Sequence, residues 1–152
     1  MPRARIFVPA AALLLAPASA FAECTISTTS VDFGTYSTTS AAPLNGVGGV
    51  RTDCRHNDAP SGVSISTGGS GSYAMRRMTN GSAQLQYNLF SDASRTSVWG
   101  NGSGGTVTVS PPITQSVGLR RIREATIYGR IPAGQNVRAG TYTDTMFVTV
   151  SF

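Results

Sequence analysis

The chain has 152 residues, and 12 basic residues, all of them arginine, against 7 acidic residues give a formal net charge of +5. Charged residues make up only 12 % of the chain, whereas serine, threonine and glycine together supply 53 residues. This composition argues against a helical bundle and favours short strands joined by tight turns, and one histidine with two cysteines leaves few groups for a metalloenzyme or an acid–base hydrolase.

Residues 1–22 have the pattern of a secretory signal peptide. Arg3 and Arg5 supply the positive start, residues 6–16 are almost entirely apolar, and Ala20 and Ala22 are the small residues that a signal peptidase requires. Cleavage is expected before Glu23, which leaves a mature domain of residues 23–152 with a net charge of +3. The apolar run is about 11 residues long, shorter than the roughly 20 of a membrane helix, so no membrane insertion is predicted.

Cys24 and Cys54 are predicted to form one disulfide, because an exported protein meets an oxidising compartment. A crosslink that closes a loop of 30 residues stabilises a fold by about 3 to 4 kcal/mol in the chain-entropy description. His56 lies close to Cys54 and raises the alternative of a nucleophilic or metal-binding cysteine. Two cysteines and one histidine cannot complete a zinc site by themselves, and the sequence runs on into Pro60 and Gly62, so we expect His56 in an exposed loop.

Alternation of apolar and polar residues is the main signal after Glu23. It predicts strands around residues 24–28, 31–33, 50–54, 63–65, 85–89, 107–109, 127–131 and 142–152. Turn residues separate these runs, among them Asn45-Gly46, Gly48-Gly49 and Asn80-Gly81. Seven or eight short strands at this spacing predict an all-β protein, an antiparallel β-sandwich of immunoglobulin type formed by a single domain.

The last predicted strand carries an apolar face and ends at the final residue. Its apolar face consists of Tyr142, Met146, Val148, Val150 and Phe152, and its polar face consists of Thr143, Thr145, Thr149 and Ser151. Proteins usually protect an open strand edge with charges or proline, but this segment has one charge, Asp144, and no proline. We therefore expect an uncovered strand edge here.

Motifs for catalysis or cofactor binding are weak. Gly100, Gly102 and Gly105 match the G-x-G-x-x-G pattern, but a predicted strand follows where a dinucleotide site needs a helix. The chain has no G-x-S-x-G motif, and its acidic residues are scattered singly. The sequence predicts no enzyme, no metal site and no cofactor.

The arginines at 120, 121 and 123 form the densest basic run. A nucleic-acid-binding surface would combine such cations with exposed aromatic residues and a larger net charge. No nucleic-acid partner is predicted, and these side chains are expected to be solvated or to contact an acidic partner. Trp99, the single tryptophan, is expected in the core or in a turn, with ligand stacking as the alternative.

Six sequence blocks occur in an order that resembles the spore coat U domain family. The resemblance covers the whole mature chain and rests on CTIS at 24–27, VDFGTY at 31–36, YNLFSD at 87–92, VWGNG at 98–102, YGRIPAGQNV at 128–137 and GTYTDT at 140–145. It implies a structural subunit of an archaic chaperone-usher pilus or a spore-coat-like assembly, exported through the periplasm to the cell surface, pilus or extracellular coat, and supporting adhesion and biofilm formation.

The resemblance also implies an incomplete immunoglobulin-like sandwich that lacks its final strand. A periplasmic chaperone lends a strand to such a subunit, and in the fibre a neighbouring subunit replaces it by donor-strand complementation, with an outer-membrane usher as a further partner. The resemblance carries over Cys24 and Cys54 as the disulfide, and Met146, Val148, Val150 and Phe152, with Tyr142 on the same face, as the wall of the groove that receives the strand.

The chain differs from polymerising members of this family in one respect. Those subunits carry a donor segment of alternating residues before the first cysteine, whereas cleavage after Ala22 would leave only Glu23 ahead of Cys24. Such a chain could accept a strand but not give one, which predicts either a terminal position in a fibre, such as the tip, or a place in a non-fibrous coat assembly. The alternative function is a self-standing secreted module that binds carbohydrate or a surface, with Trp99 and Tyr73 facing solvent.

Overall fold

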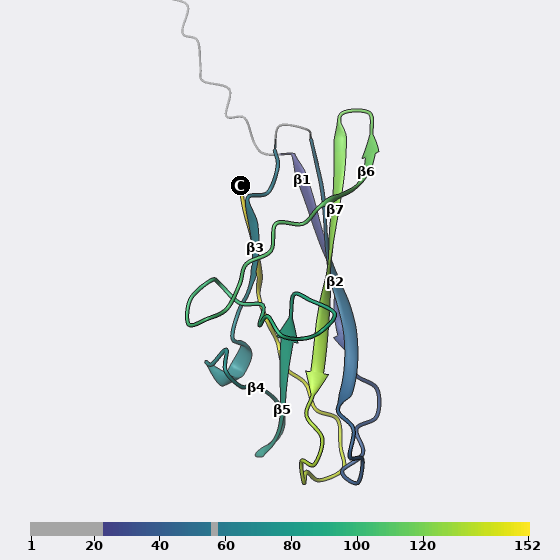
Figure 1. Ribbon diagram of the computed structural model, residues 1–152, viewed down its shortest axis with the longest axis vertical. Coiled ribbons are helices and arrows are strands. Elements are labelled where there is room, and N and C mark those ends of the chain that lie inside the picture. Colours follow the sequence, from purple (N-terminus) through teal and green to yellow (C-terminus); the bar gives the residue numbers. More distant parts are fainter. Residues whose placement is uncertain (1–22, 56–57) are drawn as a thin grey trace, which may run out of the picture.

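In the described part of the chain, strands with alternating apolar and polar side chains form two antiparallel β-sheets that share one apolar core (Figure 1). The computed structural model describes residues 23–55 and 58–152. The predicted signal peptide, residues 1–22, and the predicted loop position of His56 lie outside the described residues.

The larger sheet is built on two long strands that pair along their whole length. These are β2 (Leu44–Arg55) and β7 (Arg120–Ile131), which pair from Leu44 opposite Ile131 to Arg55 opposite Arg120. The strand order is β1-β2-β7-β5-β4, with β6 paired to β7. The other members are β1 (Cys24–Asp32), β4 (Arg76–Asn80), β5 (Ala83–Phe90) and β6 (Ile113–Val117).

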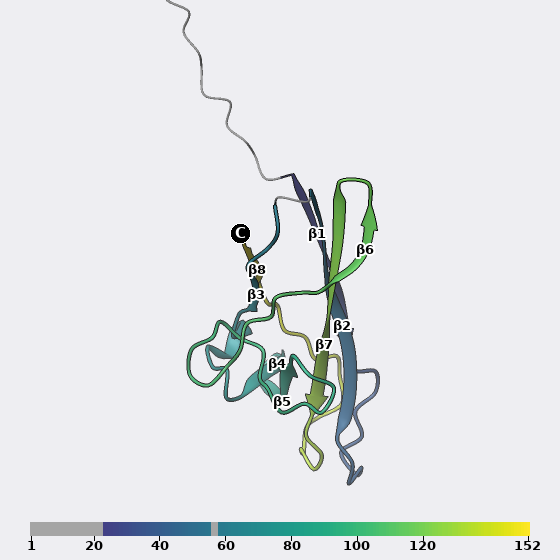
Figure 2. The same ribbon diagram turned by 45° about the horizontal axis from the view of Figure 1, so that its top comes forward.

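The smaller sheet contains β3 (Gly62–Ile65) and β8 (Val148–Ser151). They pair from Gly62 opposite Ser151 to Ile65 opposite Val148, and in both views they lie beside the long strands of the larger sheet (Figures 1 and 2). One short 3-10 helix, η1 (Gly68–Ser70), follows β3. The small sheet closes only part of the sandwich.

The core lies between the sheets, and Trp99 is its largest fully buried side chain. This side chain is fully buried, and its indole Nε1 donates a hydrogen bond of 2.9 Å to the carbonyl of Val63. The surrounding buried side chains come from β2, β3, β5 and β7: Val50, Val63, Ile65, Leu85, Tyr87, Leu89, Ile127 and Ile131. Both sheets therefore contribute to one apolar interior.

The predicted fold class, an incomplete immunoglobulin-like antiparallel β-sandwich, is confirmed. The turns predicted at Asn45-Gly46 and Gly48-Gly49 are wrong, because both pairs lie inside β2. Residues 107–109 form isolated bridges in place of the predicted strand. The alternation did not reveal β4, β6 or the charged first half of β7, where pairing with neighbouring strands overrides a weak local pattern.

Candidate functional site

Two adjoining cavities lie between β1 and the C-terminal segment, residues 137–151, which includes β8. Their volumes are about 360 Å³ and about 760 Å³. Val31, Phe33, Met78 and Tyr142 line both cavities, so the two share a boundary. We call the two cavities together the groove.

The first wall of the groove is the second half of β1 and the residues that follow it. Val31 and Phe33 lie over glycines of the larger sheet, where a Cβ atom on Gly129 would come within 2.7 Å of both side chains. A Cβ atom on Gly48 would come within 2.8 Å of Val31. Because these glycines have no side chain, Val31 and Phe33 can pack directly against the backbone of β2 and β7. The ring of Phe33 also meets the ring of Tyr87 edge-on, with the two ring centroids 5.9 Å apart.

The second wall is the C-terminal segment, in which exposed and half-buried residues alternate strictly from residue 141 to residue 150. Tyr142, Met146 and Val148 are half-buried and line the groove, whereas Phe147 points outward and is 75 % exposed. The segment crosses from one sheet to the other: Thr143 bridges Thr79 of β4, and β8 then pairs with β3. This crossing explains why only residues 148–151 of the predicted strand 142–152 form a regular strand.

The floor of the groove is the apolar core itself. Ile65, Leu89 and Ile127 line the smaller cavity, and Leu85 and Ile131 line the larger one. Each of these side chains is at most 5 % exposed, so the groove reaches the interior of the sandwich. Apolar side chains that entered it would gain about 25 cal/mol for each Å² removed from water.

Asp144 is the one charged residue that lines the smaller cavity in the described part of the chain. Its carboxylate accepts hydrogen bonds from the Tyr87 hydroxyl at 2.7 Å and from the Gly69 amide at 2.9 Å. Burial and then the hydrogen bond to Asp144 raise the pKa of Tyr87 well above its ordinary value. Asp144 thereby connects the C-terminal segment to η1 through the Gly69 amide and to β5 through the protonated hydroxyl of Tyr87.

Two strand edges flank the groove without a partner. Among the described residues, β1 pairs only with β2, and β8 pairs only with β3. The remaining edge of each strand carries backbone N–H and C=O groups that a further strand could pair with. The groove thus combines an apolar floor with two sets of free backbone groups.

Three of the five residues predicted to form the groove wall line the groove, and the other two lie outside it. Tyr142, Met146 and Val148 line the groove. Val150 packs against the core opposite Val63, beyond the groove lining. Phe152 lies past the end of β8, does not line either cavity and is 55 % exposed.

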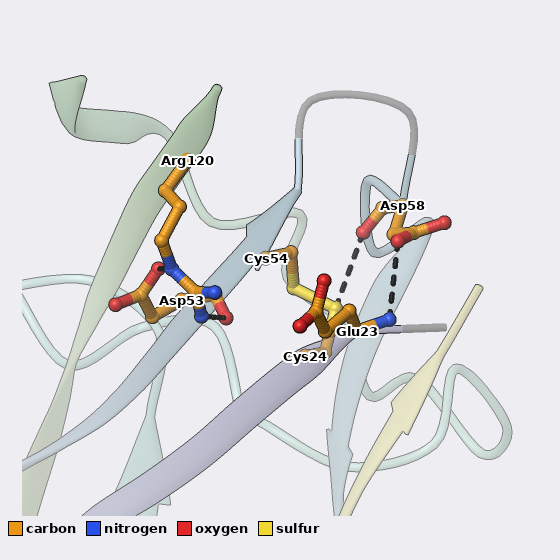
Figure 3. Close-up of a disulfide and its surroundings, with 6 residues drawn as sticks. All are labelled: Glu23, Cys24, Asp53, Cys54, Asp58 and Arg120. Atoms are coloured by element: carbon orange, nitrogen blue, oxygen red, sulfur yellow. Dashed lines mark hydrogen bonds and ion pairs between the residues drawn. A yellow bond between two sulfur atoms is a disulfide. The ribbon is translucent and has the colours of Figure 1, made fainter. Parts of the chain in front are cut away.

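Cys24 and Cys54 lie opposite each other at the paired ends of β1 and β2 and are joined by a disulfide (Figure 3). This end of β1 lies away from the half that lines the groove.

Sequence reasoning missed the opposite wall at Val31 and Phe33. The signal for this wall is a pair of apolar residues two apart, Val31 and Phe33, followed by a glycine-rich strand whose glycines resemble turn residues.

The Spore Coat Protein U domain description matches residues 10–149. The chain belongs to this family. It is 34 % identical to "Protein U" of Myxococcus xanthus over 93 residues, which cover 60 % of this chain and 48 % of that protein. The chain thus spans about half the length of this curated relative.

The fold of this Spore Coat Protein U domain is similar to a solved structure from Acinetobacter baumannii, the CsuC–CsuE chaperone-tip adhesion subunit pre-assembly complex of the archaic chaperone-usher Csu pili. The TM-score is 0.60 at 27 % sequence identity, over 87 % of this chain and 40 % of the matched chain. The predicted family resemblance is therefore confirmed.

The other residues singled out from the sequence, the arginine run and Trp99, are paired or buried within this Spore Coat Protein U domain. Arg120 pairs with Asp53 at 2.7 Å, Arg121 donates to the Gly118 carbonyl, and Arg123 is largely buried. Trp99 is 0 % exposed, which removes it as a surface for ligand stacking. Among residues 23–55 and 58–152, no group of three or more His, Cys, Asp or Glu side chains could hold a metal ion, and no helix is long and apolar enough to cross a membrane.

Proposed function

We propose that this Spore Coat Protein U domain is a structural subunit of a secreted surface assembly, a pilus or a coat, and that it accepts a partner strand in the groove. The observation that carries this proposal is the groove itself, which opens the apolar core between two unpaired strand edges. The proposed role is structural, without catalysis.

The geometry of the groove suits an extended segment better than a compact ligand. A strand between β1 and β8 would form backbone hydrogen bonds to both edges, and its alternate side chains would enter the cavities. Its apolar residues would fill the cavity lined by the buried side chains of Ile65, Leu89 and Ile127, and the walls at Val31 and Met146 would fix its register. The added strand would complete the sandwich.

The first partner proposed is a periplasmic chaperone, followed by an outer-membrane usher and neighbouring subunits. Support for the chaperone comes from the similar fold in a chaperone-subunit pre-assembly complex. The pattern of residues 1–22 supports export through the periplasm to the cell surface. In this proposal the chaperone strand holds the groove until a neighbouring subunit replaces it.

We further propose a terminal position in the assembly, with a role in adhesion and biofilm formation. Cleavage after Ala22 would leave only Glu23 ahead of Cys24. Cys24 is the first residue of β1, which is already paired within the larger sheet of this domain. A subunit of this kind receives a strand without giving one. The similarity to a complex that contains a tip adhesion subunit is consistent with that position.

Val148→Asp tests strand acceptance. Val148 lines the groove, so an aspartate there would place an unpaired charge against the incoming apolar strand. We expect the free energy of chaperone binding to weaken by about 3 kcal/mol, which corresponds to an affinity about 100-fold lower. The measurement is co-expression with the chaperone, followed by pull-down and quantification of the captured subunit in the periplasm. Val150→Asp, on the same side of β8, is expected to reduce capture as well.

The matched control is Thr149→Asp, since Thr149 is the exposed neighbour of Val148 on β8. It introduces the same charge on the outer face and is expected to leave capture unchanged. Normal capture and normal periplasmic accumulation of both valine variants would contradict strand acceptance in the groove.

A further inference from the structure

We infer that Asp58 is a receptor for the α-ammonium group that signal cleavage would create at Glu23. The backbone nitrogen of Glu23 lies 3.1 Å from Asp58 Oδ2 (Figure 3). In the uncleaved chain this nitrogen is a neutral peptide amide that donates one hydrogen bond. After cleavage before Glu23 the same atom carries a positive charge at the same place.

Among the described residues near Glu23, Asp58 is the acidic side chain for which no ion pair with a cationic side chain is formed. The Glu23 carboxylate forms an ion pair with the guanidinium of Arg55. Asp53, at the same end of β2, is paired with Arg120 at 2.7 Å. No described cationic side chain pairs with Asp58, whose contact at Oδ2 is the Glu23 nitrogen. Cleavage would supply the missing cation directly against this carboxylate, and the hydrogen bond would become charge-assisted.

The backbone around Glu23 keeps this nitrogen in place. The Arg55 amide donates to the Glu23 carbonyl at 3.3 Å, and the next residue, Cys24, is joined to Cys54. The disulfide and the first pair of the β1–β2 ladder hold Glu23 at the end of β2, and the Asp58 amide donates a hydrogen bond of 3.0 Å to the Arg55 carbonyl at the same end. The site is formed by the fold of the domain and does not depend on strand acceptance in the groove.

The consequence concerns the start of the processed chain. Pairing with Asp58 would hold the new N-terminus at the disulfide end of β1, whereas the groove begins at Thr28 and extends in the other direction. The first residue of the processed chain would be bound within its own domain. It would not serve as a free donor segment for a neighbouring subunit.

The test uses the exported protein purified from the periplasm. N-terminal sequencing and intact mass are expected to give Glu23 as the first residue. The pKa of its α-amino group is then measured by NMR from the chemical shifts of labelled Glu23, in a His56→Gln background that removes the titration of the neighbouring histidine. A carboxylate partner favours the charged amine, so we expect this pKa to be about 0.5 higher with Asp58 than in Asp58→Asn.

Two variants control for the general charge and for folding. Asp53→Asn removes an equivalent carboxylate, paired with Arg120, and is expected to leave the α-amino pKa unchanged. Asp58→Glu keeps the charge and is expected to retain part of the increase. A first residue other than Glu23, or an α-amino pKa that the Asp58→Asn substitution leaves unchanged, would overturn the inference.

Discussion

At the scale of single residues, the clearest constraint is the buried cation Arg76 at the start of β4. Its side chain is 0 % exposed and donates to the Ser66 carbonyl, to the Trp99 carbonyl at 2.7 Å and to Asn88 Oδ1 at 2.7 Å. The guanidinium carbon also lies 5.2 Å from the ring centroid of Tyr73. One charged side chain therefore connects the loop after β3, β5 and the Trp99 segment.

Replacement of Arg76 by methionine is expected to lower the free energy of unfolding by about 3 kcal/mol. Methionine keeps much of the volume but leaves buried acceptors at Ser66 and Trp99 without a donor. The measurement is guanidinium chloride unfolding of the exported protein. Arg77→Met is the matched control, because the Arg77 guanidinium donates a single hydrogen bond within the described residues, to the Met75 sulfur. A loss of similar size there would contradict the role assigned to Arg76.

At the scale of elements, the close approach of β1 to β2 and β7 decides the shape of the groove. Gly46, Gly48 and Gly129 face the side chains of Val31 and Phe33. None of these three glycines has a positive φ, so they are needed for space and not for an unusual backbone conformation. The glycine-rich part of β2 is a packing surface for the first wall of the groove.

Gly129→Ala is expected to displace this wall. The new Cβ atom would lie 2.6 Å from the Phe33 ring and 2.7 Å from Val31, so both side chains must move. We expect a loss of about 2 kcal/mol in unfolding free energy and weaker chaperone capture, measured by denaturant unfolding and by pull-down. Gly49→Ala is the matched control in β2, since the nearest atom to its Cβ position is 3.6 Å away; equal effects of the two substitutions would contradict this account.

At the scale of the whole molecule, the two sheets do not close around the core. The larger sheet is continuous across β1, β2, β7, β5 and β4, whereas the smaller sheet contains only β3 and β8 among the described residues. The groove follows from this imbalance, because the second sheet leaves one edge of β8 unpaired and leaves a cavity beside the buried side chain of Ile127. An uncovered apolar groove between strand edges favours association with another chain.

We therefore expect the exported protein to self-associate when it is purified without a chaperone and to form a discrete complex when the chaperone is present. The reason is that the unpaired edges of β1 and β8 on different copies can pair with one another, whereas a chaperone strand would occupy these edges. Size-exclusion chromatography with light scattering measures both states. A stable monomer at micromolar concentration without any partner would contradict the open-fold proposal and favour the self-standing binding module.

Local sequence pattern was sufficient for much of the sandwich and for one side of the groove. Period-two alternation located β5, β3 and the inward face of the C-terminal segment, because a half-buried strand must present every second side chain to the core. The turn predicted at Asn80-Gly81 lies one residue further on: Asn80 ends β4 and pairs with Ala83, Gly81 and Ser82 join β4 to β5, and Gly81 has φ +58°. These features depend on neighbours in the chain, so the chain alone determines them.

The other wall and the extent of the groove depended on contacts between distant segments. Nothing local distinguishes Gly46 and Gly48 from turn glycines; only the packing of Val31 and Phe33 on them places them inside a strand. The first half of β7 is a strand because β2 and β6 pair with it on both sides, in spite of its charged sequence. Sequence thus determined which side chains alternate, and the tertiary structure decided which edges stay open, because strand pairing is set by partners far away in the chain.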